Sequence, residues 1–451
     1  MINFKTSISN VTCQIQRVED LVAIISAGLD AADPEKAVRR NLVLRENLLI
    51  AGSSEFRVSD KTRIITIALG KAAPAMMSSA IACLGDKYQG GVCVCKHMEV
   101  DYVMTPATKY IVGNHPVPGE GSLQAGIEIR KAVKGLSADD IVLLLVSGGG
   151  SSLVSLPVEG VSLTDLQSVT STLLRSGANI AELNTVRKHL DLIKGGGLVR
   201  LAAPAKVAAL VLSDVVGNNL EVIASGPAYP DPTTFAEALT ILSQAALNGP
   251  VPESILRHLT IGAQGKIPET LKKDEPDSGL GFNTIIASNQ DACAAAVKKA
   301  IELGFSAELV SDSFVGEARA ASRQIVATIK NRKDLHKPFV LVWGGETTVT
   351  VTGQGKGGRN LELALAAVKG MAGLDDTFLL TLATDGEDGP TDAAGAVVCG
   401  GTLQRASEKG LNPDDYLRHN NAYAFFAQLG DLLITGPTGT NVNDLSFVIG
   451  F

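Results

Sequence analysis

The chain has few aromatic residues, and this scarcity argues against one kind of partner. Phenylalanine, tyrosine and tryptophan together make up 4% of the 451 residues, with a single tryptophan. Proteins that bind single-stranded nucleic acid stack its bases on aromatic side chains. The formal net charge of −7 also opposes broad contact with a polyanion. We therefore expect no nucleic-acid partner, although a local cluster of positive charge would still allow a small anionic ligand.

Cysteines and long apolar runs are also scarce. The six cysteines show no spacing typical of a disulfide framework. No apolar run reaches the roughly 20 residues that a membrane-spanning helix needs. The first residues contain neither an extended apolar stretch nor an arginine-rich amphipathic start, so we expect no targeting segment. These features favour a cytoplasmic protein without a membrane partner. The sequence allows a homodimer but does not fix the oligomeric state.

Apolar runs alternate with amphipathic stretches along most of the chain. This rhythm is typical of an α/β fold with mostly parallel strands. The length favours two domains. We expect an N-terminal α/β domain over residues 1–260 and a C-terminal α/β domain over 282–451. Residues 261–281 between them are charged, contain glycine and proline, and have few apolar side chains, which predicts a linker.

The most informative segment is an apolar run, 141–146, that leads directly into a glycine-rich loop. Six apolar residues predict a strand buried on both faces. Glycines let backbone N–H groups approach a ligand closely, and serines add hydroxyl groups. We interpret the loop as a binding site for a phosphate or carboxylate; the alternative is a plain glycine-rich turn. The loop residues are Ser147, Gly148, Gly149, Gly150, Ser151 and Ser152.

Three cations of the N-terminal half are candidates for contact with an anion. Lys71 directly follows the apolar run 64–69, so the predicted strand delivers it to the end of a sheet, where ligand clefts form. Asn184 is expected to cap a helix that carries Arg187 and Lys188 in its next turn. An anion there would offset the unfavourable position of two cations near the positive end of the helix dipole. Solvated surface side chains are the alternative.

The C-terminal half contributes a second group of candidate ligand contacts. Glu346 ends a predicted strand, and the loop 353–358 contains four glycines and precedes Arg359 and Asn360. Arginine can hold a phosphate or carboxylate with two parallel hydrogen bonds. The same loop contains the string GxGxxG, but the run before it is threonine-rich rather than apolar. The acids about 20 residues further on precede a strand instead of ending one, so this is a poor dinucleotide fingerprint.

Three aspartates follow predicted strands. Asp214 comes after the run 207–212, and Asp385 and Asp388 come after 377–383. Carboxylates in such positions bind Mg²⁺ or accept a proton, whereas helix caps and surface turns are the alternatives. Asp214 and Asp385 are candidates for both roles and Asp388 for metal binding. Glycine loops, separate cations and carboxylates without histidine–cysteine clusters are what phosphoryl transfer requires.

Taken together, these segments resemble the class II glycerate 2-kinase family, whose C-terminal part is known as the MOFRL domain. The matching segments extend from about residue 70 to the carboxyl terminus and are GKAAPAM, VGNHPVP, LLLVSGGGSSLVSLP, LNTVRKHLDLIKGGGL, LSDVVGNNLEVIASGP, GGETTVTVTGQGKGGRNLELAL, LATDGEDGPTDAAGA and GPTGTNVNDL. The resemblance implies two α/β domains, the first of them Rossmann-like, with the active site in the cleft between them. It also implies that the family's catalytic cations correspond to Lys71 and Arg359.

The activity implied by the resemblance is phosphorylation of the 2-hydroxyl of D-glycerate by ATP with Mg²⁺, which gives 2-phosphoglycerate and ADP. Two alternatives are an NAD(P)H-dependent hydroxypyruvate reductase and a non-catalytic sensor of a phosphorylated metabolite. The poor dinucleotide fingerprint disfavours the reductase.

Overall fold

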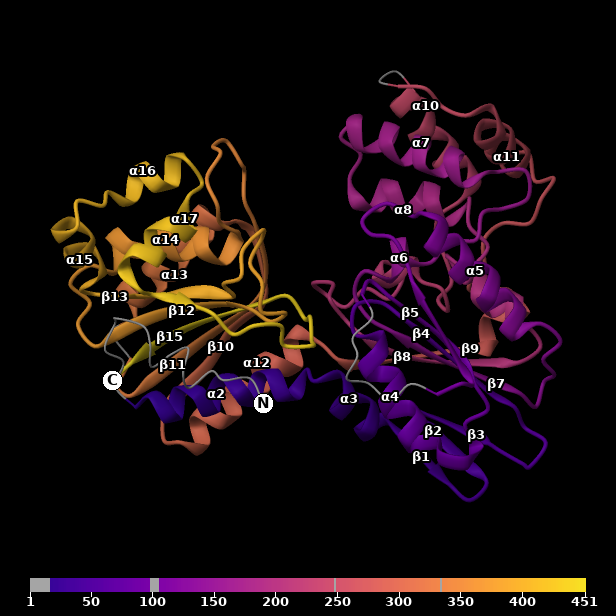
Figure 1. The fold of residues 1–451 in the computed structure, drawn as a ribbon, viewed down its shortest axis with the longest axis horizontal. Coiled ribbons are helices and arrows are strands. Elements are labelled where there is room, and N and C mark those ends of the chain that lie inside the picture. The colour runs from indigo at the N-terminus through magenta and orange to yellow at the C-terminus, as the bar shows by residue number, and fades with distance from the viewer. Residues whose placement is uncertain (1–16, 98–104, 247–248, 333–334) are drawn as a thin grey trace. The chain divides into compact units, whose positions relative to one another are not determined.

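A computed structural model of the protein describes residues 17–97, 105–246, 249–332 and 335–451. The chain divides into two compact units (Figure 1). The N-terminal unit comprises residues 34–286. The C-terminal unit combines residues 17–33 with residues 287–451. Both units consist of sheets covered by helices, which confirms the predicted α/β class.

The N-terminal unit is built on a six-stranded sheet with the order β6-β5-β4-β7-β8-β9. The first five strands in this order pair in parallel. In chain order the strands are β4 (Ile64–Leu69), β5 (Gly91–Cys95), β6 (Thr108–Val112), β7 (Ile141–Val146), β8 (Lys206–Leu212) and β9 (Gly281–Ala287). Counted from β4, the sheet has the order 3-2-1-4-5-6 of the Rossmann fold. The predicted Rossmann-like N-terminal domain is therefore confirmed.

Both faces of this sheet are covered. Every residue of β7 is buried, as the continuous apolar run predicts. Helices α5 (Glu120–Val133) and α9 (Gly197–Ala202) pack against one face. Helix α4 (Ala73–Leu84) packs against β4 and β5. A helical cluster with its own apolar core consists of α7 (Leu163–Arg175), α8 (Ile180–Lys188), α10 (Phe235–Ala245) and α11 (Glu253–Ala263). The unit also contains α3 (Pro34–Asn41) and a small antiparallel sheet of β1 (Leu42–Arg45), β2 (Leu48–Ala51) and β3 (Ser54–Arg57).

The C-terminal unit has a second six-stranded sheet, with the order β10-β11-β15-β12-β13-β14. Strands β10 and β11 are parallel, whereas β15 runs antiparallel to both β11 and β12. This sheet is therefore mixed, unlike that of the N-terminal unit. The strands are β10 (Ser306–Glu317), β11 (Phe339–Thr348), β12 (Thr377–Ala383), β13 (Gly395–Cys399), β14 (Leu432–Leu433) and β15 (Asp444–Gly450).

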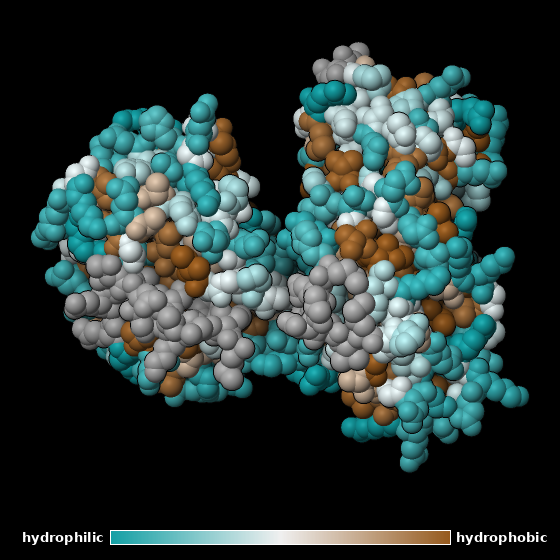
Figure 2. Space-filling model, in the orientation of Figure 1, coloured by the Kyte–Doolittle hydropathy of each residue, from teal (hydrophilic) through white to brown (hydrophobic). Residues whose placement is uncertain are grey.

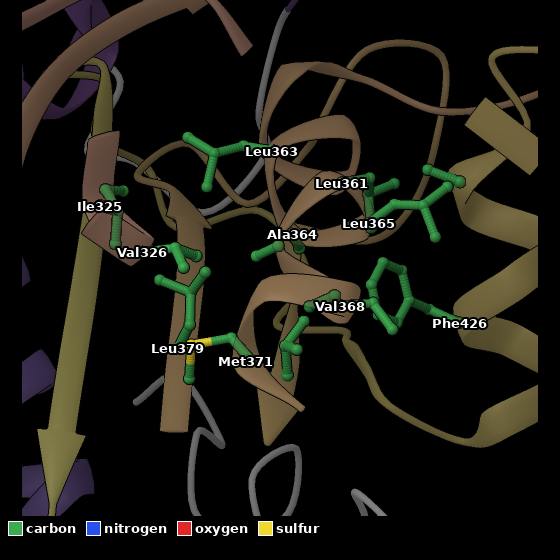
Figure 3. Packing of buried hydrophobic residues seen from close by; sticks show 14 of the residues in the cluster. Ile325, Val326, Leu361, Leu363, Ala364, Leu365, Val368, Met371, Leu379 and Phe426 are labelled. Carbon is green, nitrogen blue, oxygen red and sulfur yellow. The ribbon is translucent and has the colours of Figure 1, made fainter. Parts of the chain in front are cut away.

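The core of the C-terminal unit surrounds α14 (Arg359–Met371). Figure 3 shows Phe426 of α17 (Ala422–Leu429) pointing toward Val368, and Met371 lying beside Leu379 of β12. Helix α13 (Ala318–Asn331) also packs against α14. Such close packing fixes the position of α14, whose first residue is Arg359.

The structure divides the chain differently from the sequence prediction of 1–260, 261–281 and 282–451. Helix α2 (Val18–Ala31) packs against α12 (Asn289–Glu302) and so belongs to the C-terminal unit. Residues 261–281 are tied to the N-terminal unit: Leu271 is buried, and its backbone exchanges hydrogen bonds with Gly195 and Asp231. Strand β9 then adds to the N-terminal sheet. Apolar and polar residues both anchor this segment, since Leu271 is buried and Lys272 Nζ donates to the carbonyl of Asp231 at 3.0 Å.

No helix in the described part of the chain is both long and apolar enough to span a membrane. On the face shown in Figure 2, hydrophobic residues form separate patches among hydrophilic ones.

Candidate functional site

The candidate site of the N-terminal unit lies where the strand order reverses, between β4 and β7. In open α/β sheets, ligands bind outside the carboxyl ends of the strands at this point. Strand β4 leads there into Gly70 and Lys71, and β7 leads into the loop that begins at Ser147. The two segments that the sequence singled out are therefore neighbours, because β4 and β7 pair along their length.

Hydrogen bonds join these two loops directly. The amide of Lys71 donates to the carbonyl of Gly148 at 2.9 Å, and the amide of Ala72 donates to Ser147 Oγ at 3.1 Å. Ser147 Oγ lies 3.3 Å from the carbonyl oxygen of Leu69, to which it donates. The loops thus hold each other in place, while the Lys71 side chain is exposed at the same edge.

The glycines of the loop are required by its surroundings. A Cβ atom on Gly148 would lie 2.1 Å from Asp214 Oδ2. Gly149 has φ +83°, a left-handed conformation that favours glycine. Among the described residues, no hydrogen bond is made by the backbone amides of Gly148, Gly149 or Gly150. This is the arrangement expected of a loop that offers N–H groups to a ligand.

The three serines of the loop have different surroundings. Ser147 and Ser152 are buried, and Ser152 Oγ donates to the carbonyl of Gly149 at 3.3 Å. Ser151 is half-buried, and its Oγ lies 2.7 Å from Ser225 Oγ. Ser151 is therefore the loop serine whose hydroxyl group can reach a ligand, whereas Ser147 and Ser152 stabilise the loop.

Two titratable side chains flank the loop. Asp214 follows β8 and is half-buried; burial raises its pKa, against the opposing effects of its own amide and of Lys71. His115 follows β6, and its ring is 3.7 Å from the position of a Cβ on Gly149. Burial lowers the pKa of His115, and the charges of Lys71 and Lys96 lower it further. A carboxyl group with a raised pKa beside a cation is suited to accept a proton.

Helix α8 differs from its prediction. It begins after Asn179, which caps it together with Glu182 in a reciprocal pair of hydrogen bonds. Asn184 is therefore not the cap but a buried residue within the helix, and Arg187 and Lys188 lie in the last turn, where the dipole favours cations. The signal for the true start was the Asn179-to-Glu182 spacing of a capping box.

The two cations of α8 have separate environments. Lys188 is buried in an ion pair with Asp231, with Nζ 3.2 Å from Oδ1, and lines a cavity of about 390 Å³ to which none of the loop residues 147–152 contributes. Arg187 has a buried Nε without a hydrogen-bond partner among the described residues. Burial lowers the pKa of Arg187 and the charge of Asp191 opposes this. A buried donor of this kind calls for an acceptor, so Arg187 remains a candidate for ligand contact and Lys188 has a structural partner.

In the C-terminal unit the candidate residues gather around Asp444. This residue begins β15, opposite Gly345 of β11 on one side and Ala383 of β12 on the other. Arg359 donates to its carboxylate twice, from Nε at 2.5 Å and from Nη2 at 3.0 Å. Arg359 Nη1 lies 3.2 Å from Glu346 Oε1. The guanidinium predicted to bind an anion is thus already held between two carboxylates of its own unit.

Asp388, predicted as a metal ligand, caps α14 in the structure. Its Oδ1 accepts from the amide of Asn360 at 3.1 Å and from the side-chain amide at 3.3 Å, and its Oδ2 accepts from the amide of Leu361 at 2.8 Å. Burial raises the pKa of Asp388 to about 6 despite these bonds. The buried Asn360 contributes to this cap. Asp385 is half-buried, and its Oδ1 accepts from the amide of Glu387 at 3.2 Å.

Most of the predicted residues thus form two groups, one in each unit, whereas Lys188 lies at a separate cavity. Lys71, the glycine loop and Asp214 lie together at the edge of the N-terminal sheet. Glu346, Arg359, Asn360 and Asp388 lie together in the C-terminal unit.

Comparison with known proteins places this arrangement in a family. Residues 20–260 match a family described as a domain of unknown function (DUF4147), and residues 339–444 match the MOFRL family. A glycerate 2-kinase of Pyrococcus horikoshii is 41% identical over 94% of this chain and 96% of its own length. A D-glycerate 2-kinase of Thermotoga maritima is 42% identical over the same shares. The chain belongs to the glycerate kinase family.

The fold of the family agrees with this assignment. A crystal structure of a glycerate kinase from Thermotoga maritima superposes with a TM-score of 0.85 at 40% identity, over 96% of this chain and 99% of that one. The family resemblance found in the sequence is therefore confirmed.

The sequence did not predict that several other residues belong to these two groups. His115 lies in the segment VGNHPVP, and Asp444 is the penultimate residue of GPTGTNVNDL. Ser225, which contacts Ser151, lies in the segment IASGP. Each follows an apolar run or lies in a loop rich in small residues, but its partner is distant in the sequence. The sequence could therefore show that each residue lies in a family motif, but not which residue it contacts.

Proposed function

We propose that this protein is a glycerate 2-kinase that transfers the γ-phosphoryl group of ATP to the 2-hydroxyl of D-glycerate. An O–P bond forms at the glycerate oxygen, the bond to the ADP leaving group breaks, and the hydroxyl proton passes to a base. The observation that carries the proposal is the sheet edge of the N-terminal unit, where Lys71 and Asp214 flank a loop whose three glycine amides make no hydrogen bond among the described residues. Two relatives that span this chain carry the same activity in their names.

Each side chain at this edge has a role that its surroundings support. The exposed Lys71 ammonium stabilises negative charge on the transferred group or holds the substrate carboxylate. The amides of Gly148, Gly149 and Gly150 bind an anion of ATP or glycerate. Asp214 accepts the hydroxyl proton, a task that its raised pKa favours. Arg187 satisfies its buried Nε with an acceptor of the ligand.

Arg359 supplies the second cation in this proposal. Five N–H groups belong to a guanidinium, and Asp444 and Glu346 engage three of them. The remaining donors, or an exchange of Glu346 for phosphate, allow contact with the triphosphate. Joint action of Lys71 and Arg359 on one phosphoryl group is part of the proposal.

Mg²⁺ fits the donor set only as an ion that arrives with the nucleotide. Within the described residues, no group of three or more His, Cys, Asp or Glu side chains is suited to hold a metal ion. Asp214 or Asp385 would each contribute one carboxylate, and phosphate oxygens and water would complete the shell that Mg²⁺ prefers. When bound, Mg²⁺ neutralises charge on the phosphates. We place the reaction in the cytosol, because the six cysteines show no spacing typical of a disulfide framework.

The deciding assay measures ADP release from ATP and Mg²⁺ with and without D-glycerate, and NADH oxidation with hydroxypyruvate in a parallel sample. Glycerate-dependent ADP release, with 2-phosphoglycerate as the product in a ³¹P spectrum, is the expected result. NADH oxidation without ADP release would instead identify a reductase, and ligand binding without turnover a sensor.

A further inference from the structure

A chain of three buried or half-buried side chains supports the glycine loop from behind. Ser151 Oγ lies 2.7 Å from Ser225 Oγ, and Ser225 Oγ donates to Asn184 Oδ1 at 3.1 Å. Ser225 is completely buried and Asn184 is 5% exposed, whereas Ser151 is half-buried. The chain thus leads from the interior of α8 to the surface of the loop.

The backbone holds Ser225 in an unusual conformation. Ala224 has φ +50° and Ser225 has φ +61°, so two successive residues with side chains adopt the left-handed region. Such residues persist only where their surroundings fix them, and they concentrate at functional sites. Here the amide of Gly195 donates to the carbonyl of Ser225 at 2.9 Å, and a Cβ on Gly150 would lie 3.0 Å from Ala224 Cβ. The segment is therefore positioned against the loop.

The direction of the hydrogen bonds follows from the number of protons. A carbonyl oxygen such as Asn184 Oδ1 can only accept, so Ser225 uses its single hydroxyl proton on it. Ser225 must then accept from Ser151, whose single proton is used in turn. Ser151 Oγ is left with lone pairs alone and cannot donate to the oxygen of a phosphate or carboxylate.

We infer that Ser151 binds the non-reacting hydroxyl of the substrate as an acceptor, and that Ser225 and Asn184 are positioning residues that fix this polarity. The inference rests on the proposed function. The donors of glycerate are its two hydroxyl groups, and the 2-hydroxyl gives up its proton during transfer. Ser151 cannot accept that proton as a base, because it already donates its own proton to Ser225, which in turn donates to Asn184. The 3-hydroxyl is the remaining partner, so this contact selects substrates that carry it.

The test compares D-glycerate with D-lactate, which has a methyl group in place of the CH₂OH group. The measured quantity is the ratio of kcat/KM for the two acids or, if lactate is not phosphorylated, of the glycerate KM to the inhibition constant of lactate. In Ser151→Ala, we expect discrimination in favour of glycerate to fall about tenfold, the worth of one such hydrogen bond. Ser171→Ala, a change of an exposed serine on α7, is the matched control and should leave the ratio unchanged.

Two further variants test the polarity. Ser225→Ala frees the proton of Ser151 and should also reduce the discrimination. Asn184→Asp keeps an acceptor that receives the proton of Ser225 and should keep the wild-type ratio. If Asn184→Asp instead reduces the ratio as far as Ser225→Ala does, the order of donors is the reverse of the one inferred. Ser151→Ala decides the inference even if aspartate at position 184 prevents folding.

The failures of the two proposals are distinguishable. A wild-type protein without glycerate-dependent ADP release overturns the proposed function. An active wild type whose discrimination is the same in Ser151→Ala overturns only the inference. Equal losses for both acids in Ser151→Ala also overturn it, because the serine would then serve the part that the two substrates have in common.

Discussion

The two units present their cations in opposite ways. In the N-terminal unit the Lys71 side chain is exposed beside a loop whose glycine amides make no hydrogen bond among the described residues. In the C-terminal unit Arg359 is held by Asp444 and Glu346. Lys71 has an exposed side chain, whereas Arg359 is paired with the buried carboxylate of Asp444 and the more exposed one of Glu346. The same change, removal of one positive charge, should therefore have different consequences in the two units.

The largest effect on turnover is expected for Lys71→Ala. Loss of a cation that stabilises the transferred phosphoryl group should lower kcat by about 10³-fold. The thermal midpoint should stay within about 1 °C of wild type, because an exposed side chain contributes little to stability. Lys206→Ala, which removes an exposed lysine at the opposite end of β8, is the control. Near-normal turnover of Lys71→Ala would remove Lys71 from the mechanism.

Arg359→Ala should lower both turnover and stability. We expect kcat to fall about 10²-fold or more, by the loss of one charge-stabilising group. The variant leaves Asp444, whose side chain is 9% exposed, without its bidentate partner. An unpaired buried carboxylate costs about 1–3 kcal/mol, which a lower thermal midpoint will report.

A double variant separates these two effects. Adding Asp444→Asn to Arg359→Ala removes the unpaired charge, so part of the lost stability should return while turnover stays low. If Arg359→Ala proves as stable as Lys71→Ala, the contrast between the two cations does not hold.

Gly148→Ala should lower turnover, because the added methyl group displaces the glycine loop or the carboxylate of Asp214. A methyl group there would lie 2.1 Å from Asp214 Oδ2, so the loop or the carboxylate must move. A displacement of about 1 Å can reduce turnover by about 10²-fold. Gly279→Ala is the matched control, because its Cβ would meet no atom within 4 Å and its φ is ordinary. Equal activity of the two variants would show that the loop tolerates the shift.

The smallest expected effect is on the pH dependence of stability in the C-terminal unit. The pKa of Asp388 is raised from 3.8 to about 6 by burial. Protonation of Asp388 therefore contributes stability that is fully present below about pH 4 and is lost as the pH rises through 6. Asp388→Asn cannot titrate, so the thermal midpoint of wild type should exceed that of the variant most at pH 4.5 and by a few degrees less at pH 7. Parallel midpoints across this range would contradict the assignment.

Features encoded in adjacent residues could be predicted from the sequence. The apolar run 141–146 ends in glycines, and the run 64–69 ends in Gly70 and Lys71, so strands and ligand loops were both evident. That both loops lie at one edge was not predicted; it follows from the parallel pairing of β4 with β7.

Features that depend on distant partners could not be predicted in the same way. Nothing near Asp388 in the sequence shows that it caps a helix beginning at residue 359, or that Lys188 is buried against Asp231. Nor does the sequence of residues 261–281 show that Leu271 is buried or that Lys272 donates to the carbonyl of Asp231. Pairings of this kind are decided by tertiary packing.

The place of α2 has a consequence for how this protein is made. Helix α2 packs closely on α12: a Cβ atom added to Gly28 would lie 3.1 Å from the carbonyl oxygen of Ala292. During synthesis α2 leaves the ribosome before its partner α12, which follows only after residues 34–286 of the N-terminal unit. The apolar face of α2 therefore has no native partner until α12 has been synthesised, and other contacts or a chaperone must cover it until then. A C-terminal fragment that starts at residue 287 would lack this helix and expose the surface that it covers.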